Sequence, residues 1–223
     1  MSQQFHPSAN KMPILGGPIL QPLRAIIFDI GRVIIRVDLE RSFEAYGKHD
    51  GLSAEQVWTA LQTDARWNDW QEGRMAPQDW HKHLCEKFKL YLSFEEFCET
   101  WNRVLDPVTI LPESLFERLS ANCRLALLSN TDPIHAAHIE ATFPFVRHFP
   151  VRVYSCRIGA CKPGAMIYHH TLREVDALPE ETLFVDDLRE NVTGALSLGM
   201  TGFHFTSPGE LLSEFTRLGL WRS

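Results

Sequence analysis

The second half of the chain alternates short apolar runs with stretches whose apolar residues recur at helical spacing. The apolar runs predict buried strands at 124–130, 151–156, 182–187 and 201–205, with an earlier one at 25–30. Helix starts are indicated by Asp132-Pro133, by Pro163 and by Ser207-Pro208-Gly209-Glu210. Strands that alternate with helices predict an α/β fold, with a Rossmann-like parallel sheet core and helices on both faces.

Residues 39–106 have a different pattern, in which helical periodicity dominates and no strand stands out. Capping boxes at Ser53-Ala54-Glu55-Gln56 and Ser93-Phe94-Glu95-Glu96 indicate helix starts, and Gly73 and Pro77 interrupt the run between them. Five of the six tryptophans fall in this segment: Trp58, Trp67, Trp70, Trp80 and Trp101. The pattern predicts a helical unit inserted after the first strand.

These patterns divide the chain into three parts. We predict a flexible N-terminal tail at 1–24, an α/β core made of 25–38 and 107–223, and a helical cap at 39–106. The cap would join the core through connecting segments near 38–41 and 105–112. We therefore expect it to move as a lid.

Composition narrows the classes of partner. The 223-residue chain is 44% hydrophobic, carries a formal net charge of −6 and has no basic stripe, so nucleic acid is not an expected partner. Its apolar runs are too short for a membrane span, and its N-terminus does not have the pattern of a signal peptide. The five cysteines form no paired framework and no CxxC, which favours the cytoplasm and argues against a zinc site. A monomer and a homodimer are both compatible with the sequence.

Polar residues gather where the predicted strands end. They are Asp29 after the first strand, Ser129 and Asn130 after the second, Lys162 shortly after the third, and Asp186 and Asp187 after the fourth. Each has an ordinary explanation as a turn, cap or exposed residue. Ligands of open parallel sheets bind outside the carboxyl ends of the strands, so the four segments together predict one site.

The residue types at this site favour chemistry on a phosphate group. A carboxylate such as Asp29 can act as a nucleophile. The adjacent acids Asp186 and Asp187 repel each other unless a cation is present, and their oxygen atoms suit Mg²⁺. A serine hydroxyl and the N–H groups at a helix N-terminus bind phosphate-like anions, and Lys162 adds positive charge.

Four short motifs carry a resemblance to a known family. In chain order, "FDIG", "LLSNT", "CKP" and "FVDD" resemble the four motifs of the haloacid dehalogenase-like hydrolases. The resemblance spans about 25–206 and points to the branch with a helical cap after the first strand. Within that branch, "FDIGRVIIRVD" and "VDDLREN" are similar to bacterial sugar-phosphate phosphatases of the glucose-1-phosphate phosphatase kind.

The resemblance implies that Asp29 is the nucleophile, forms an aspartyl-phosphate and also binds Mg²⁺. Gly31 would bind the metal through its backbone carbonyl, and Asp186 and Asp187 would be further ligands. Asn191, one helical turn beyond Asp187, would orient the acidic pair.

The same resemblance implies a phosphate site made by Ser129, the backbone amide of Asn130, and Lys162, which would also be a catalytic residue. The implied function is that of a Mg²⁺-dependent phosphatase acting on a small phosphorylated metabolite, with a sugar phosphate as the nearest class. A dehalogenase, and a phosphate-binding module that has lost catalysis, are the alternatives.

Gly31 departs from the family pattern, because these phosphatases usually carry there a second aspartate that protonates the leaving group. Glycine cannot do this. The cap residues Asp69, His81 and His83 are candidates to replace it, although a surface or packing role is the ordinary explanation for each. The cap tryptophans likewise either pack the cap or face the site and stack on a sugar ring.

Overall fold

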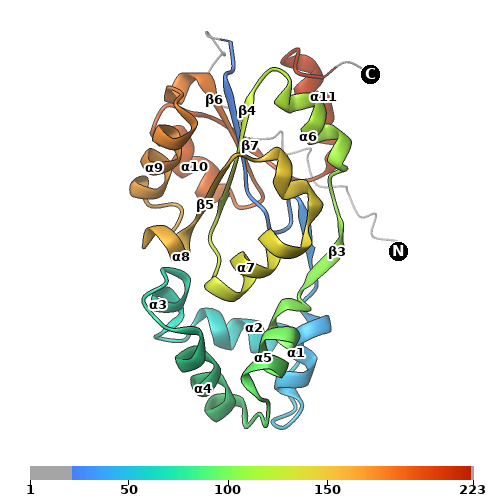
Figure 1. Ribbon diagram of the computed structural model, residues 1–223, viewed down its shortest axis with the longest axis vertical. Helices are drawn as coiled ribbons and strands as arrows, with labels where there is room; N and C mark the ends of the chain where they lie inside the picture. The colour runs from blue at the N-terminus through green and yellow to red at the C-terminus, as the bar shows by residue number, and fades with distance from the viewer. Residues whose placement is uncertain (1–21, 222–223) are drawn as a thin grey trace, which may run out of the picture.

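A parallel sheet forms the centre of the protein in a computed structural model that describes residues 22–221 (Figure 1). Its strands are β1 (Ala25–Phe28), β4 (Arg124–Ser129), β5 (Val151–Tyr154), β6 (Thr182–Asp186) and β7 (Thr201–His204). They lie in the order β5-β4-β1-β6-β7, and every neighbouring pair is parallel. The predicted α/β, Rossmann-like fold is confirmed. The strand order reverses at β1, where open parallel sheets bind ligands.

Side chains of the sheet alternate between two cores. Ile26 and Phe28 point into one hydrophobic cluster, and Ala25 and Ile27 point into the other. The first cluster includes residues of α6 (Glu113–Ser120), α7 (Pro133–Thr142) and α11 (Pro208–Arg217), and the second includes residues of α9 (Ala165–Val175) and α10 (Arg189–Ser197). Both faces of the sheet are therefore covered.

Local details differ from the expected elements at three places. The third predicted strand ends at Tyr154, and the residues after it form the short helix α8 (Ser155–Ile158). Helix α9 begins at Ala165 rather than at Pro163. Ser207 caps α11, but the Glu210 carboxylate accepts a bond from Thr206 Oγ1, so it does not complete the capping box. Two 3-10 helices, η1 (Pro144–His148) and η2 (Pro179–Glu181), complete the core.

Helices follow one another through the inserted segment and lie below the sheet in Figure 1. They are α1 (Glu40–Gly47), α2 (Ala54–Gln62), α3 (Trp67–Gln71), α4 (Pro77–Phe88) and α5 (Phe94–Asn102). Both capping boxes form as expected, at Ser53 before α2 and at Ser93 before α5. Trp70, Trp80 and Trp101 are fully buried in a third hydrophobic cluster, so the insertion has a core of its own.

The base of the insertion is a two-stranded ribbon that the sequence did not predict. β2 (Ile35–Val37) pairs antiparallel with β3 (Leu105–Thr109). Backbone bonds from Asp38 N to the Val104 carbonyl and from Ile110 N to the Ile34 carbonyl extend the pairing at both ends. The two connecting segments are thus held together rather than loose. Motion of the insertion as a lid stays a prediction.

Most of the predicted N-terminal tail, residues 1–21, lies outside the described residues. Its last residues belong to the core: Leu23 packs against the first cluster, and Arg24 N donates to the Glu181 carbonyl. Within residues 22–221, the helices are too short or too polar to cross a bilayer.

Candidate active site

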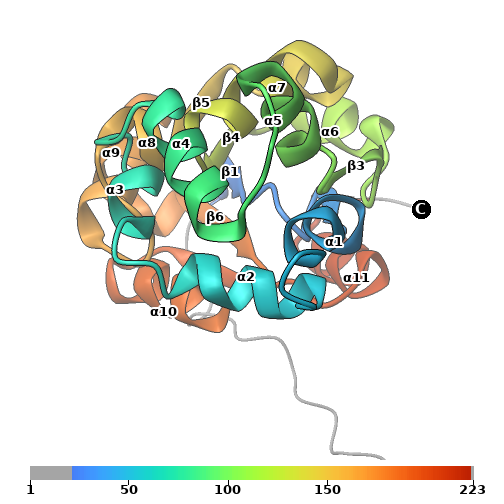
Figure 2. The ribbon, with the colours of Figure 1, turned by 90° about the horizontal axis from the view of Figure 1, so that it is seen from below.

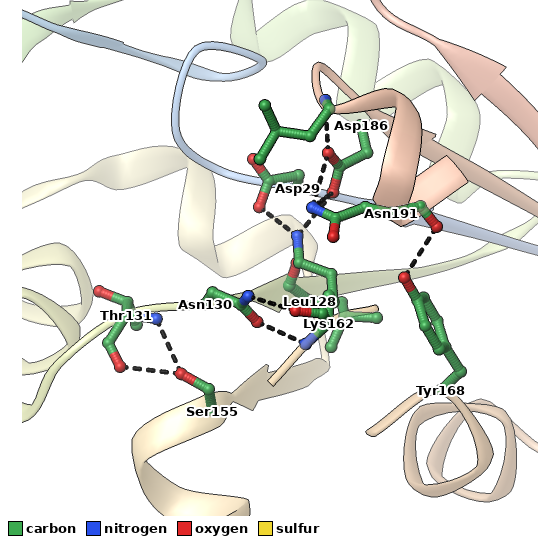
Figure 3. A network of polar contacts seen from close by, with 10 residues as sticks. Asp29, Leu128, Asn130, Thr131, Ser155, Lys162, Tyr168, Asp186 and Asn191 are labelled. Atoms are coloured by element: carbon green, nitrogen blue, oxygen red, sulfur yellow. Dashed lines mark hydrogen bonds and ion pairs between the residues drawn. The ribbon is translucent and has the colours of Figure 1, made fainter. Parts of the chain in front are cut away.

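The ends of β1, β4 and β6 bring an ammonium group and two carboxylates into contact (Figure 3). Lys162 lies between α8 and α9, and its Nζ donates to Asp29 Oδ1 at 2.6 Å and to Asp186 Oδ2 at 2.7 Å. A third bond runs to the Leu128 carbonyl at 2.9 Å. All three N–H groups of the ammonium are therefore used within the protein. Binding of phosphate by Lys162 stays a prediction, and a direct bond would require one of these contacts to exchange.

The three predicted acidic ligands lie together. One carboxylate oxygen each of Asp29, Asp186 and Asp187 lies within 4.8 Å of the others. Asn191 Nδ2 lies 3.1 Å from both oxygens of Asp186, and Leu188 N donates to Asp186 Oδ1 at 2.8 Å. Of the two acids that Asn191 was expected to orient, its side chain therefore contacts Asp186. Three carboxylates beside one ammonium leave an excess of negative charge, and these oxygen donors fit a hard divalent cation such as Mg²⁺.

Burial controls the charges of this cluster. It raises the pKa of Asp29 to about 7, since the attraction of Lys162 only partly offsets desolvation and the nearby Asp186 opposes ionisation. Burial and Asp186 also raise the pKa of Asp187. Burial alone would lower the pKa of Lys162, but Asp186 and Asp29 raise it, so the lysine stays protonated. Carboxylates that repel one another in this way favour binding of a cation.

The turn after Asp29 places Gly31 in the lining of the same cavity as Asp29 and Asp187. Arg32 has a left-handed φ of 58°, and its N–H donates to the Ile35 carbonyl at 2.7 Å. A Cβ at Gly31 would meet Val37 Cγ2 at 3.5 Å, an ordinary contact. The space at position 31 would therefore accommodate a larger residue than glycine. Metal binding through its carbonyl stays a prediction.

Asn130 has a structural role that the motif did not suggest. Its Nδ2 donates to the Lys162 carbonyl, and its Oδ1 accepts from Lys162 N, both at 2.8 Å. This pair of bonds fixes the lysine loop against the end of β4. The neighbouring Ser129 is buried at the same edge. Phosphate binding by Ser129 and by the backbone amide of Asn130 stays a prediction.

A cavity of about 340 Å³ connects these residues to the insertion. Its sheet end is lined by Asp29, Gly31, Ser129, Asn130, Lys162 and Asp187. Its far wall includes Trp58, Trp67 and Trp101, and stacking of a sugar ring on them stays a prediction. Trp70 and Trp80 pack inside the insertion, whereas these three reach the cavity. In Figure 2, which views the molecule from below, the insertion lies in front of the sheet.

The three residues considered as substitutes for the missing acid lie away from this cavity. Asp69 forms an ion pair with Arg74 at 2.7 Å. His81 Nε2 donates to the Leu92 carbonyl, and His83 Nε2 donates to an Asp64 carboxylate oxygen, both at 2.8 Å. None of the three is among the described residues that line the cavity. In this arrangement they cannot take the place of an acid at position 31.

An ion pair beside the cavity was not expected from the sequence. Asp132 Oδ1 caps α7, as predicted, by accepting from the Ile134 and His135 N–H groups at 2.9 Å. Its Oδ2 accepts from Trp101 Nε1 at 3.0 Å and from His135 Nδ1 at 2.8 Å. His135 Nε2 donates in turn to the Trp101 carbonyl at 3.0 Å. Both ring nitrogens face acceptors, which requires the protonated imidazolium. Helix α5 of the insertion is thereby bound to α7 of the core.

A second contact joins the insertion to the core near α8. Ser155 Oγ donates to the Gln71 carbonyl at 2.7 Å and accepts from Thr131 N at 2.9 Å. Gly73 follows with φ +68°, and a Cβ there would lie 2.0 Å from the Cys156 carbonyl oxygen. No sequence pattern indicates this close approach, because Gly73 fits equally well as a helix terminator.

The His135 ion pair gives stability an expected pH dependence. Burial alone would lower the pKa of His135, but the adjacent Asp132 carboxylate raises it above 6.5. The pair therefore contributes fully below about pH 6.5, and its contribution is lost as the pH rises through the higher folded-state pKa. Urea unfolding of wild type and His135→Gln between pH 6 and 9 tests this. The stability difference should shrink as the pH rises, and a constant difference would show that the histidine does not titrate with folding.

Comparisons with known proteins agree with the fold and the motifs. The model of the haloacid dehalogenase-like hydrolase family matches residues 23–199. A D-ribitol-5-phosphate phosphatase of Bacteroides thetaiotaomicron is 24% identical over 200 residues, which cover 87% of this chain and 97% of that protein. A sesquiterpene phosphatase of Aspergillus oryzae is 26% identical over 202 residues, which cover 87% and 96%.

A solved structure shares the same architecture. It is a family enzyme from Bacteroides thetaiotaomicron in complex with magnesium and inorganic phosphate, with a TM-score of 0.71 at 23% identity, and the match covers 83% of this chain and 96% of that one. The family match extends over most of the chain, from the strand that carries Asp29 to the helix that carries Asn191. This chain belongs to the haloacid dehalogenase-like hydrolase family.

Proposed function

We propose that this protein is a Mg²⁺-dependent phosphatase that hydrolyses a small phosphorylated metabolite through an aspartyl-phosphate on Asp29. The observation that carries the proposal is the position of Asp29. Its carboxylate opens into the cavity and also belongs to the three-carboxylate cluster with Asp186 and Asp187. A nucleophile beside a divalent-cation site is what phosphoryl transfer requires, because positioning and charge stabilisation supply most of the catalysis.

The residues have distinct tasks in this reaction. Asp29 and the Asp186–Asp187 pair would hold Mg²⁺, with Gly31 as a backbone ligand, and the cation would neutralise charge on the phosphate oxygens. A carboxylate oxygen of Asp29 forms a bond to phosphorus while the ester bond breaks, and the leaving oxygen keeps the electron pair and takes a proton. Water then attacks phosphorus, the bond between phosphorus and the Asp29 oxygen breaks, and the proton of the water passes to solvent or to the released phosphate, which restores the carboxylate. Lys162 stays charged and holds Asp29 in place throughout.

The substrate class is supported less directly. The motifs suggest a sugar phosphate, and one relative is named as a D-ribitol-5-phosphate phosphatase, which is compatible with it. A relative of similar identity is named as a sesquiterpene phosphatase. The two names imply leaving groups of very different polarity, so together they do not single out one substrate class. A location in the cytoplasm and a monomeric or homodimeric state are part of this proposal, on the grounds of composition given above.

An assay with p-nitrophenyl phosphate tests the function. We expect turnover with added Mg²⁺ and a loss of more than about 100-fold after treatment with EDTA, since a cation that offsets several kcal/mol of charge at the transition state is removed. Readdition of Mg²⁺ should restore the rate. Turnover that is insensitive to EDTA would contradict the metal site. Turnover of a 2-haloacid instead of the phosphate would favour the dehalogenase.

A further inference from the structure

The cavity described above has two chemically different ends, and the second end bears on the substrate. Beyond the polar residues at the sheet edge, apolar side chains form much of the lining, among them Val37, Phe43, Trp58, Trp67, Trp101 and Ile139. Most of these side chains come from the insertion and its base. A phosphate monoester bound at Asp29 would place its leaving group against this wall.

Aromatic side chains give the wall a fixed shape. Phe43 and Trp58 stack at 6.0 Å with an interplanar angle of 12°, and Trp58 meets Trp67 edge to face at 5.4 Å. Trp58 and Trp67 are half-buried and line the cavity, and Phe43, which also lines it, is almost fully buried against Trp58. Rings that support one another in this way offer a preorganised apolar surface.

Three polar residues of the wall, Asp132, His135 and Trp101, already have partners. The Asp132 carboxylate accepts from two backbone N–H groups, from Trp101 Nε1 and from His135 Nδ1. His135 uses its other nitrogen on the Trp101 carbonyl. These three residues line the cavity, but their hydrogen bonds are made to one another. A hydroxyl group placed against them would lose its water partners without gaining new ones, and an unsatisfied polar group is costly.

Three further polar side chains lie toward solvent, whereas Thr131 is buried next to Asp132. Arg32, Gln62 and Glu190 line the cavity and are exposed. Gln71 is half-buried, and its backbone carbonyl accepts a hydrogen bond from Ser155 Oγ. Contacts at such a rim keep access to water and discriminate weakly between ligands. An open-chain polyol needs several convergent partners along its length, which this arrangement does not provide.

We propose that the cavity binds phosphate monoesters whose leaving group is an apolar ring or hydrocarbon chain, in preference to open-chain polyol phosphates. This inference rests on the proposed phosphatase function. It differs from the sugar phosphate that the sequence motifs suggest. Trp58 is the specificity-determining residue, because it contacts both Phe43 and Trp67 and faces the cavity.

The test compares two esters of primary alcohols, so that leaving-group basicity differs little. The purified full chain with Mg²⁺ is assayed on 3-phenylpropyl phosphate and on ribitol 5-phosphate, with p-nitrophenyl phosphate as the reference for activity. We expect kcat/KM to be at least about tenfold higher for the phenylpropyl ester, mainly through a lower KM, since its apolar surface is buried against the wall.

The variant Trp58→Ala locates the preference. We expect it to lower the ratio of the two kcat/KM values about tenfold. The ratio does not depend on the fraction of folded enzyme, so partial misfolding leaves the readout intact. Trp221→Ala is the matched control, because Trp221 packs on Arg118 outside the cavity. It should leave the ratio unchanged.

Each outcome has a distinct meaning. Equal or better turnover of ribitol 5-phosphate by wild type overturns the inference and leaves the phosphatase function standing. If the preference for the phenylpropyl ester is unchanged in Trp58→Ala, the aromatic wall is not its cause. Absence of turnover with all three phosphates removes the proposed function, and the inference falls with it.

Discussion

Asp29→Asn is expected to lower the kcat for phosphate monoesters by more than about 10³-fold, because the amide keeps the shape of the side chain but is not a nucleophile. The variant should fold. Burial raises the pKa of Asp29 to about 7, which means that the charged carboxylate is disfavoured at its site in the absence of metal. Exchange for a neutral side chain relieves this, so thermal unfolding in metal-free buffer should show no loss of stability.

A second variant separates loss of the nucleophile from loss of a metal ligand, since Asp29 is expected to serve as both. Asp187 contributes an oxygen to the same cluster but is half-buried and makes no contact with Lys162 through its carboxylate in the described structure. Asp187→Asn should weaken Mg²⁺ binding, and excess Mg²⁺ should restore much of its activity. Excess Mg²⁺ should not rescue Asp29→Asn. Rescue of both variants to the same degree would show that Asp29 is a ligand and that the nucleophile lies elsewhere.

The parts of the site that the sequence predicted are those set by sheet geometry. Asp29, Ser129 and Asp186 each follow or end a short apolar run, and parallel strands bring their carboxyl ends to one edge. Local chemistry was equally informative, since Ser53 and Ser93 start helices with capping boxes built within four consecutive residues. In both cases the information lies within a few residues of sequence.

The parts that were missed depend on partners far along the chain. β3 contains Pro107 and carries the exposed Val108, so it lacks the alternation of a strand and forms only because β2 lies beside it. Ser155 continues an apparent strand by composition, yet its hydroxyl bridges Thr131 and Gln71 and the chain turns into α8. No local pattern distinguishes these arrangements.

Asp132 has one role that its sequence neighbours reveal and a second role that they do not. The cap of α7 involves neighbours two and three residues away, and the sequence shows it directly. The bond to Trp101 joins residues that are 31 positions apart, from the insertion and the core. Its existence depends on how the insertion docks, which the pattern of either segment does not contain.

Gly31 stands where related phosphatases usually carry an acid that protonates the leaving group. The leaving oxygen needs a proton, and the groups near the cavity that could offer one are already engaged: both ring nitrogens of His135 donate to acceptors, and the Lys162 ammonium has three partners. The oxygen must therefore leave as an anion or take its proton from water or from a neighbouring hydroxyl, such as those of Ser129 and Thr131. The barrier should follow the basicity of the leaving group.

A series of aryl phosphates with graded phenol pKa, extended by one alkyl phosphate, measures this dependence. We expect kcat/KM of wild type to fall steeply as the leaving group becomes more basic. The matched variant is Gly31→Asp, because Gly31 lines the same cavity and a Cβ at this position meets Val37 at an ordinary 3.5 Å. General acid catalysis is worth about 10²–10⁴-fold, so the variant should gain most on the alkyl ester, change little on the most acidic phenol, and flatten the series. A flat series in wild type would show that another residue already supplies the proton, and the glycine would then carry no chemical deficit.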